Sequence, residues 1–153
     1  MIEIKNETEK VILVGVSLSD QDDTKESLEE LKDLVSTAGA ETVGMVIQNR
    51  EQQHPGTYVG KGKIEELKSM IWELRATGIV CDDELSPAQM KNLQDELDVK
   101  VMDRTLIILD IFAARAASGE GKLQVELARL QYQLPRLAGR GVQLSRQGGG
   151  IGT

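Results

Sequence analysis

The run VILVGVSL, residues 11–18, decides the fold, because its apolar side chains follow one another without alternation. A strand with one face in water alternates apolar and polar residues. A continuous apolar run is instead typical of a strand covered on both faces of a parallel sheet. Three further short apolar segments follow, at residues 42–47, 79–81 and 99–102. The sequence therefore predicts four buried strands.

Segments with helical spacing lie between and after these strands. The first predicted helix begins near Thr24 and stops at Gly39, and the others cover residues 63–77, 87–97 and 106–117. Strands and helices thus alternate along the chain. This order predicts an α/β fold: a four-stranded, mainly parallel sheet with helices on both faces, followed by a long carboxyl-terminal helix.

The last helix, predicted for residues 119–137, carries an apolar stripe of five leucines at steps of four and three residues: Leu123, Leu127, Leu130, Leu134 and Leu137. Such a stripe needs a partner, because burying five leucines is worth about 8–15 kcal/mol. We expect this helix to be one arm of a helical hairpin whose second arm lies beyond Thr153. Two alternatives stay open: two copies pair their arms, or the stripe covers the chain's own sheet.

Three parts are expected along the chain: an α/β sheet domain at residues 1–117, the helical arm at 118–137 and a basic glycine-rich loop at 138–153, before the second arm. The joint between the first two parts lies at residues 118–122, because each glycine costs a helix about 1 kcal/mol relative to alanine. Pro135 is expected to kink or end the arm. We expect the loop to lie at the tip of the projecting arm.

The net charge of −7 conceals a division along the chain. Residues 104–153 hold seven basic residues against three acidic ones, a net charge of +4, which leaves −11 for residues 1–103. Only the basic part can approach phosphate favourably. The arginines and glycines of residues 136–150 suit contacts to an RNA backbone, and the lack of aromatic residues there excludes base stacking. A disordered glycine tail is the alternative interpretation.

Several classes of protein are disfavoured by what the sequence lacks. The single cysteine, Cys81, cannot form an intrachain disulfide, and no apolar run approaches the roughly 20 residues of a membrane span. Without an amino-terminal secretory signal, the expected location is the cytoplasm. No nucleophile and base pattern indicates a catalytic site. We expect His54 at the surface and Cys81 in the core.

One glycine- and lysine-rich motif could be a phosphate-binding site or a connector without a function of its own. Gly60, Lys61, Gly62 and Lys63 open a predicted helix, where free backbone N–H groups attract anions. The spacing is not that of a Walker A motif. The alternative is a flexible connector with solvated lysines.

Acidic residues follow two of the predicted strands, at residues 20–23 and 82–84. Together they could hold a hard cation such as magnesium, because open parallel sheets place ligands at this edge. Aspartate is also a common helix cap, and this role is favoured here. No metal site is therefore expected.

Five segments carry a resemblance to a known family: TYVGKGKIEEL (57–67), DDELSPAQMKNL (82–93), VMDRTLIILDIFAARA (101–116), EGKLQVELARLQYQLPRL (120–137) and LSRQGGGIGT (144–153). In combination they resemble the amino-terminal part of the HflX-type GTPases, and they cover most of the chain after residue 57. Proteins of this family bind the large ribosomal subunit and split or rescue stalled ribosomes, notably under stress. The resemblance therefore implies a ribosome-binding module.

The resemblance also assigns roles to residues. It implies that the leucine stripe packs against the second arm, and that a set of residues contacts the rRNA of the large subunit: Arg136, Arg140, Ser145, Arg146, Gln147, Gly148, Gly149 and Gly150. The family's GTP-binding domain, with its GTP and magnesium, follows the segment seen here. No catalytic residue and no cofactor is therefore expected in this chain.

Two other functions stay open. The sheet could bind a nucleotide through Lys61 and Lys63 and support an ATPase-type activity. Alternatively, the chain could be an interaction domain that forms a homodimer by pairing the leucine stripes of two copies.

Overall fold

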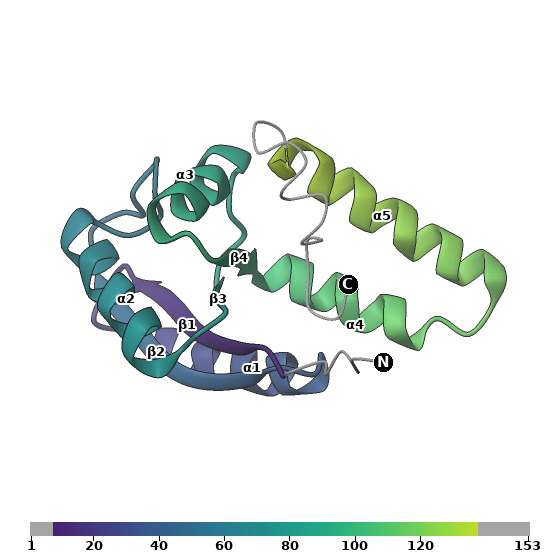
Figure 1. The fold of residues 1–153 in the computed structure, drawn as a ribbon, viewed down its shortest axis with the longest axis horizontal. Helices are drawn as coiled ribbons and strands as arrows, with labels where there is room; N and C mark the ends of the chain where they lie inside the picture. Colours follow the sequence, from purple (N-terminus) through teal and green to yellow (C-terminus); the bar gives the residue numbers. More distant parts are fainter. Residues whose placement is uncertain (1–7, 138–153) are drawn as a thin grey trace, which may run out of the picture.

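The computed structural model describes residues 8–137. Strands and helices alternate within that range as the sequence predicts (Figure 1). The elements are β1 Lys10–Ser17, α1 Thr24–Thr37, β2 Glu41–Asn49, α2 Lys61–Leu74, β3 Gly78–Cys81, α3 Pro87–Leu97, β4 Lys100–Asp103, α4 Arg104–Arg115 and α5 Gly119–Leu137. The α/β fold class is confirmed. In this part of the chain, no helix is both long and apolar enough to span a membrane.

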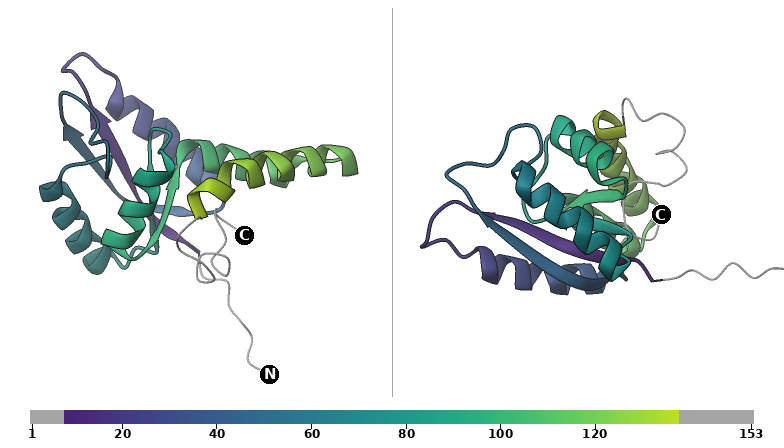
Figure 2. Two further views of the ribbon diagram at one scale, coloured as in Figure 1. Left: turned by 90° about the horizontal axis from the view of Figure 1, so that it is seen from above. Right: turned by 60° about the vertical axis from the view of Figure 1, so that its left-hand side comes forward.

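The sheet has the strand order β2-β1-β3-β4, and all neighbouring strands run parallel. Helices α2 and α3 cover one face, whereas α1 and α4 cover the other (Figure 2). Ile12 and Val14 of β1 pack under α2 and α3, and Val11 and Leu13 pack under α1 and α4. Both faces of β1 are therefore buried, which explains its apolar run without alternation.

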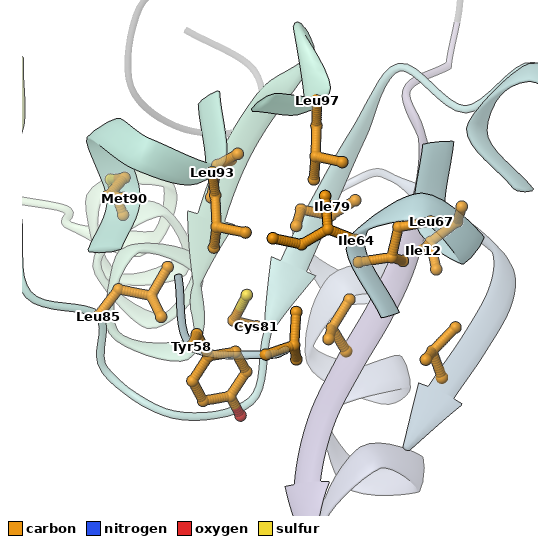
Figure 3. Packing of buried hydrophobic residues seen from close by; sticks show 14 of the residues in the cluster. Ile12, Tyr58, Ile64, Leu67, Ile79, Cys81, Leu85, Met90, Leu93 and Leu97 are labelled. Atoms are coloured by element: carbon orange, nitrogen blue, oxygen red, sulfur yellow. The ribbon is translucent and has the colours of Figure 1, made fainter. Parts of the chain in front are cut away.

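The core under α2 and α3 extends into the loop that joins β2 to α2 (Figure 3). Tyr58 and Val59 of this loop are fully buried. Tyr58 adopts a left-handed backbone conformation with φ of 67°, and its hydroxyl donates a hydrogen bond of 2.6 Å to the Asp83 carboxylate. The loop between β2 and α2 therefore contributes two residues to the core. Cys81 is buried, as predicted.

The same loop is held by hydrogen bonds of its own. His54, expected at the surface, is half-buried, and its Nδ1 accepts the backbone N–H groups of Gly56 and Thr57 at 3.0 and 3.1 Å. Two side chains of α3 also bind this loop: Gln89 donates a hydrogen bond to the His54 carbonyl, and Asn92 donates one to the Gly56 carbonyl. The loop is therefore fixed against α3, so α2 begins from a defined position.

Helix α5 returns antiparallel beside α4 after a turn at residues 116–118 (Figure 1). The break falls just before the predicted joint, and Pro135 does not end α5, which continues to Leu137. The carboxyl end of α5 lies back beside α3, where Arg136 contacts the Leu85 carbonyl. The far tip of the α4–α5 pair is therefore the turn. The expectation that residues 138–153 start from the tip of a projecting arm is wrong.

Candidate nucleic-acid interface

The leucine stripe of α5 lies on the solvent-facing side of the helix. Leu123, Leu127, Leu130 and Leu134 are exposed by 71%, 55%, 44% and 61%. The alternative in which the stripe covers the chain's own sheet is therefore wrong for these four residues. The side chain of Leu137 is not among those described. The second helical arm expected to cover the stripe stays a prediction.

A buried carboxylate attaches the opposite side of α5 to the sheet. Asp103, at the end of β4, is fully buried. Its carboxylate accepts the backbone N–H of Leu85 at 2.9 Å and that of Leu106 at 3.0 Å, and it also accepts the Tyr132 hydroxyl. Burial raises the pKa of Asp103, and these donors oppose the rise. One aspartate thus caps α4 and binds α5.

Arg136 completes this attachment. Its Nη2 donates to the Leu85 carbonyl at 2.7 Å, and its Nη1 donates to the Tyr132 carbonyl at 2.8 Å. The guanidinium also lies over the Tyr132 ring, 3.6 Å from the ring centroid. Arg136 was predicted to contact rRNA, yet both of its terminal nitrogens bind the protein's own backbone.

An ion pair joins α5 to α4 further along the helix. Arg129 Nη2 lies 3.0 Å from Asp110 Oδ1, and both side chains are almost fully buried. Arg129, Tyr132 and Arg136 recur at steps of three and four residues, so they form a polar stripe on one side of α5. Reasoning from the sequence missed this stripe because it followed the leucines. The helical spacing of the three polar residues was the signal that could have revealed it.

The remaining residues predicted to contact rRNA lie outside the described part of the chain: Arg140, Ser145, Arg146, Gln147, Gly148, Gly149 and Gly150. The structure therefore fixes the position from which this loop continues, at the end of α5 beside α3. Contacts of the loop residues themselves stay a prediction.

The predicted phosphate site, residues 60–63, lies at the start of α2. Gly60 is the N-cap and Lys61 is the first helical residue. A Cβ atom at Gly60 would lie 2.6 Å from Arg50 Nη1, so the glycine leaves room for that guanidinium. Lys63 pairs with Glu66 at 2.7 Å. The structure thus brings Arg50 to the predicted residues, a basic group that the sequence pattern did not place there.

The acidic residues after β3 bind side chains of the protein. Asp82 pairs with Arg104 at 2.7 Å, and Asp83 accepts the Tyr58 hydroxyl. Ser86 caps α3, because its side chain accepts a backbone N–H of the first helical turn. The capping role predicted for Asp82 and Asp83 is therefore wrong. Within residues 8–137, no three His, Cys, Asp or Glu side chains are placed to hold a metal ion.

Asp22, after β1, does act at a helix start. Its Oδ1 accepts the hydroxyl of Thr24 at 2.7 Å and the backbone N–H of Thr24 at 3.3 Å, and Thr24 is the first residue of α1. Its other oxygen accepts the Leu18 N–H at 2.6 Å. The Thr24 hydroxyl, with the Ser17 hydroxyl and these N–H groups, holds the pKa of Asp22 well below its ordinary value.

Two family models match the chain. The model described as GTP-binding GTPase N-terminal matches residues 25–113, and the model described as GTP-binding GTPase Middle Region matches residues 115–153. The boundary between the two matches falls at the end of α4. Helix α5 and the residues after it therefore belong to the second match.

Curated relatives share one name. GTPase HflX of Lacrimispora saccharolytica is 66% identical over 100% of this chain, and GTPase HflX of Caldanaerobacter subterraneus is 52% identical over 100%. GTPase HflX of Escherichia coli is 43% identical over 94% of the chain. The chain covers 36%, 35% and 34% of these proteins, so it spans about a third of their length.

Solved structures of GTP-binding proteins share the fold. A GTP-binding protein from the archaeon Sulfolobus solfataricus, in complex with GDP, matches with a TM-score of 0.64 and 28% identity over 90% of this chain and 42% of that one. The SsGBP and GDP complex matches with a TM-score of 0.66 and 28% identity over 90% of this chain and 39% of that one.

Proposed function

The chain belongs to the HflX family of GTPases, and on this premise we propose that it is a non-catalytic module that binds the rRNA of the large ribosomal subunit. In the longer proteins of the family, the module serves ribosome splitting or rescue. The observation that carries the proposal is the charge division, +4 in residues 104–153 against −11 in residues 1–103. A polyanion attracts the first part and repels the second, so encounter with RNA orients the molecule.

The proposed contacts are made by the loop after α5, which supplies arginine forks for phosphate and glycines for close backbone approach: Arg140, Ser145, Arg146, Gln147, Gly148, Gly149 and Gly150. Arg136 is left out of this set because its terminal nitrogens bind protein carbonyls. The proposal therefore depends on two arginines, Arg140 and Arg146.

GTP hydrolysis belongs, in this proposal, to the part of the relatives that the chain does not span. The chain covers 36% of the Lacrimispora relative, and no GxxxxGK[ST] phosphate-binding motif occurs in its sequence. GTP and magnesium are therefore proposed as cofactors of the longer protein. The chain by itself is expected to lack GTPase activity.

The leucine stripe is proposed to pack against a second helical arm in the longer protein. Its four described members are each exposed by 44% or more. Apolar area of this size is favourable to bury. Packing on the second arm would place the basic loop at the connection between the two helices, where it is free to meet RNA.

Replacing Arg140 and Arg146 together by alanine tests the proposal in the full-length protein that contains this chain. If both arginines meet phosphate, the plot of log affinity against log salt becomes less steep by roughly two. Affinity is measured by cosedimentation with purified large subunits at several salt concentrations.

A matched control removes two exposed lysines from α1, Lys25 and Lys32, which lie in the acidic part of the chain. This control is expected to keep both the affinity and the salt slope. An unchanged slope in the Arg140→Ala, Arg146→Ala variant would contradict the proposed contact.

A further inference from the structure

A closed ring of contacts attaches the end of α5 to the sheet domain. Asp103 accepts the Leu85 N–H at 2.9 Å and also accepts the Tyr132 hydroxyl. Arg136 donates to the Leu85 carbonyl at 2.7 Å and to the Tyr132 carbonyl at 2.8 Å. Both polar backbone groups of Leu85 are therefore held, its N–H by Asp103 and its carbonyl by Arg136.

We propose that this ring is a latch that fixes where α5 ends, and that Tyr132 and Arg136 are positioning residues for the basic loop rather than RNA ligands. The latch sets the place from which the chain continues after Leu137, beside α3 and the loop that follows β3. The link to RNA rests on the proposed function. The latch itself stands on contacts among the described residues.

The ring requires the particular chemistry of its members. Tyr132 and Arg136 are four residues apart, so they share one side of α5, and the guanidinium lies 3.6 Å from the ring centroid. A guanidinium can stack on a ring and donate to two carbonyls at once because it is planar and forked. A lysine at position 136 would keep the charge and lose this geometry.

Burial couples the charged members of the ring. Asp103 is fully buried. Burial raises its pKa, and the Arg136 charge opposes the rise. A buried charge that loses its partner is strongly unfavourable, so removing one member weakens the others. The ring is therefore expected to open as a unit.

The leucines at the end of α5 do not help to attach the helix to the sheet domain. Leu130 and Leu134, in the last two turns of α5, are exposed by 44% and 61%. Segments with few buried apolar contacts open locally at a lower cost than the rest of a domain. The position of these turns therefore depends on the polar ring and on the Tyr132 side chain, which packs against the core under α1 and α4.

Amide hydrogen exchange tests the latch directly, in the chain itself. Tyr132→Phe keeps the aromatic ring and removes the hydroxyl, and Arg136→Lys keeps the charge and removes the fork. Each variant is expected to exchange the amides of residues 130–137 at least about tenfold faster, with those of β1 unchanged. Tyr58→Phe is the matched control, because it removes a different hydroxyl bond to a carboxylate, that of Asp83. Unchanged exchange at residues 130–137 in both variants overturns the latch.

Salt dependence separates positioning from RNA contact, in the full-length protein. Tyr132→Phe and Arg136→Gln are both expected to weaken binding to the large subunit while the salt slope stays the same. Arg115→Gln removes an equal charge from the exposed end of α4 and serves as the control.

The outcomes of the two experiments are distinguishable. A slope less steep by about one in Arg136→Gln, with normal binding in Tyr132→Phe, would make Arg136 a phosphate ligand and overturn its positioning role. Faster exchange with unchanged affinity would also overturn that role. Absence of binding by the unsubstituted protein would instead count against the proposed function, and the exchange measurement would still decide whether the latch exists.

Discussion

At the scale of single residues, charged side chains at the carboxyl edge of the sheet are used to join elements to one another. Arg104 is the clearest case. Its guanidinium binds the Asp82 carboxylate after β3, the Glu30 carboxylate on α1 and the Ser27 carbonyl, at 2.7 to 2.9 Å. Asp82, which the sequence places at a typical ligand-binding edge, is therefore paired with a cation of the protein itself.

Asp22 gives a pH prediction at this scale. Because its pKa is lowered in the folded protein, the ionised carboxylate stabilises the fold above its ordinary pKa of 3.8, and this stabilisation is lost as the pH falls below that value. Asp22→Asn removes the titrating group. Urea unfolding between pH 6 and pH 2 is expected to show a stability difference from the unsubstituted protein that narrows with falling pH.

Gln21→Ala changes an exposed residue of the same turn that does not titrate, so this control is expected to keep the pH dependence of the unsubstituted protein. A stability difference for Asp22→Asn that stays constant, or that widens towards low pH, would show that the Thr24 and Ser17 bonds do not act on the ionised form.

At the scale of elements, α5 carries two stripes with different partners. The polar stripe of Arg129, Tyr132 and Arg136 binds α4 and the sheet domain, and the leucine stripe faces solvent. A helix normally buries its apolar side and exposes its polar side. The reversed arrangement in α5 is what makes a further apolar partner necessary.

The Leu127→Ala substitution tests whether a partner covers the leucine stripe. In the chain alone the substitution is expected to change the free energy of unfolding by less than about 0.5 kcal/mol, because Leu127 is 55% exposed. In the longer protein, where we propose that the second arm covers it, the expected loss is about 2–5 kcal/mol. Denaturant unfolding of both proteins gives the comparison.

Leu93→Ala is the control for this prediction, because Leu93 of α3 is fully buried. Its substitution is expected to lower the free energy of unfolding by about 2–5 kcal/mol in either protein. Similar small losses for Leu127→Ala in both proteins would remove the hairpin proposal. Dimerisation of the chain in sedimentation, abolished by Leu127→Asp, would assign the stripe to a second copy.

The elements themselves were predictable from the sequence where the signal is local. Helices α3 and α5 have the predicted bounds, because Ser86 and Pro87 mark the start of α3 and the leucine spacing marks α5. The strand order and the docking of α5 were not predictable. They depend on contacts such as that of Asp103 with Tyr132, which join distant segments and leave no periodic pattern in the sequence.

At the scale of the whole molecule, the end of α5 lies against the acidic sheet domain. The ring of Asp103, Leu85, Tyr132 and Arg136 holds this end of α5 beside α3 (Figure 2). A chain with an acidic part and a basic part favours one orientation on a polyanion, since only the basic part is attracted. We infer that this asymmetry lets the module present its loop to RNA.

Photocrosslinking tests whether the loop after α5 meets rRNA, as we propose. A photoreactive amino acid is placed at Ser145 in the full-length protein, and in a second variant at the exposed Lys32 of α1. With large subunits bound, we expect crosslinks to rRNA from position 145 and none from position 32. Crosslinks from position 32 alone, or none from position 145 while the protein is bound, would contradict the proposal.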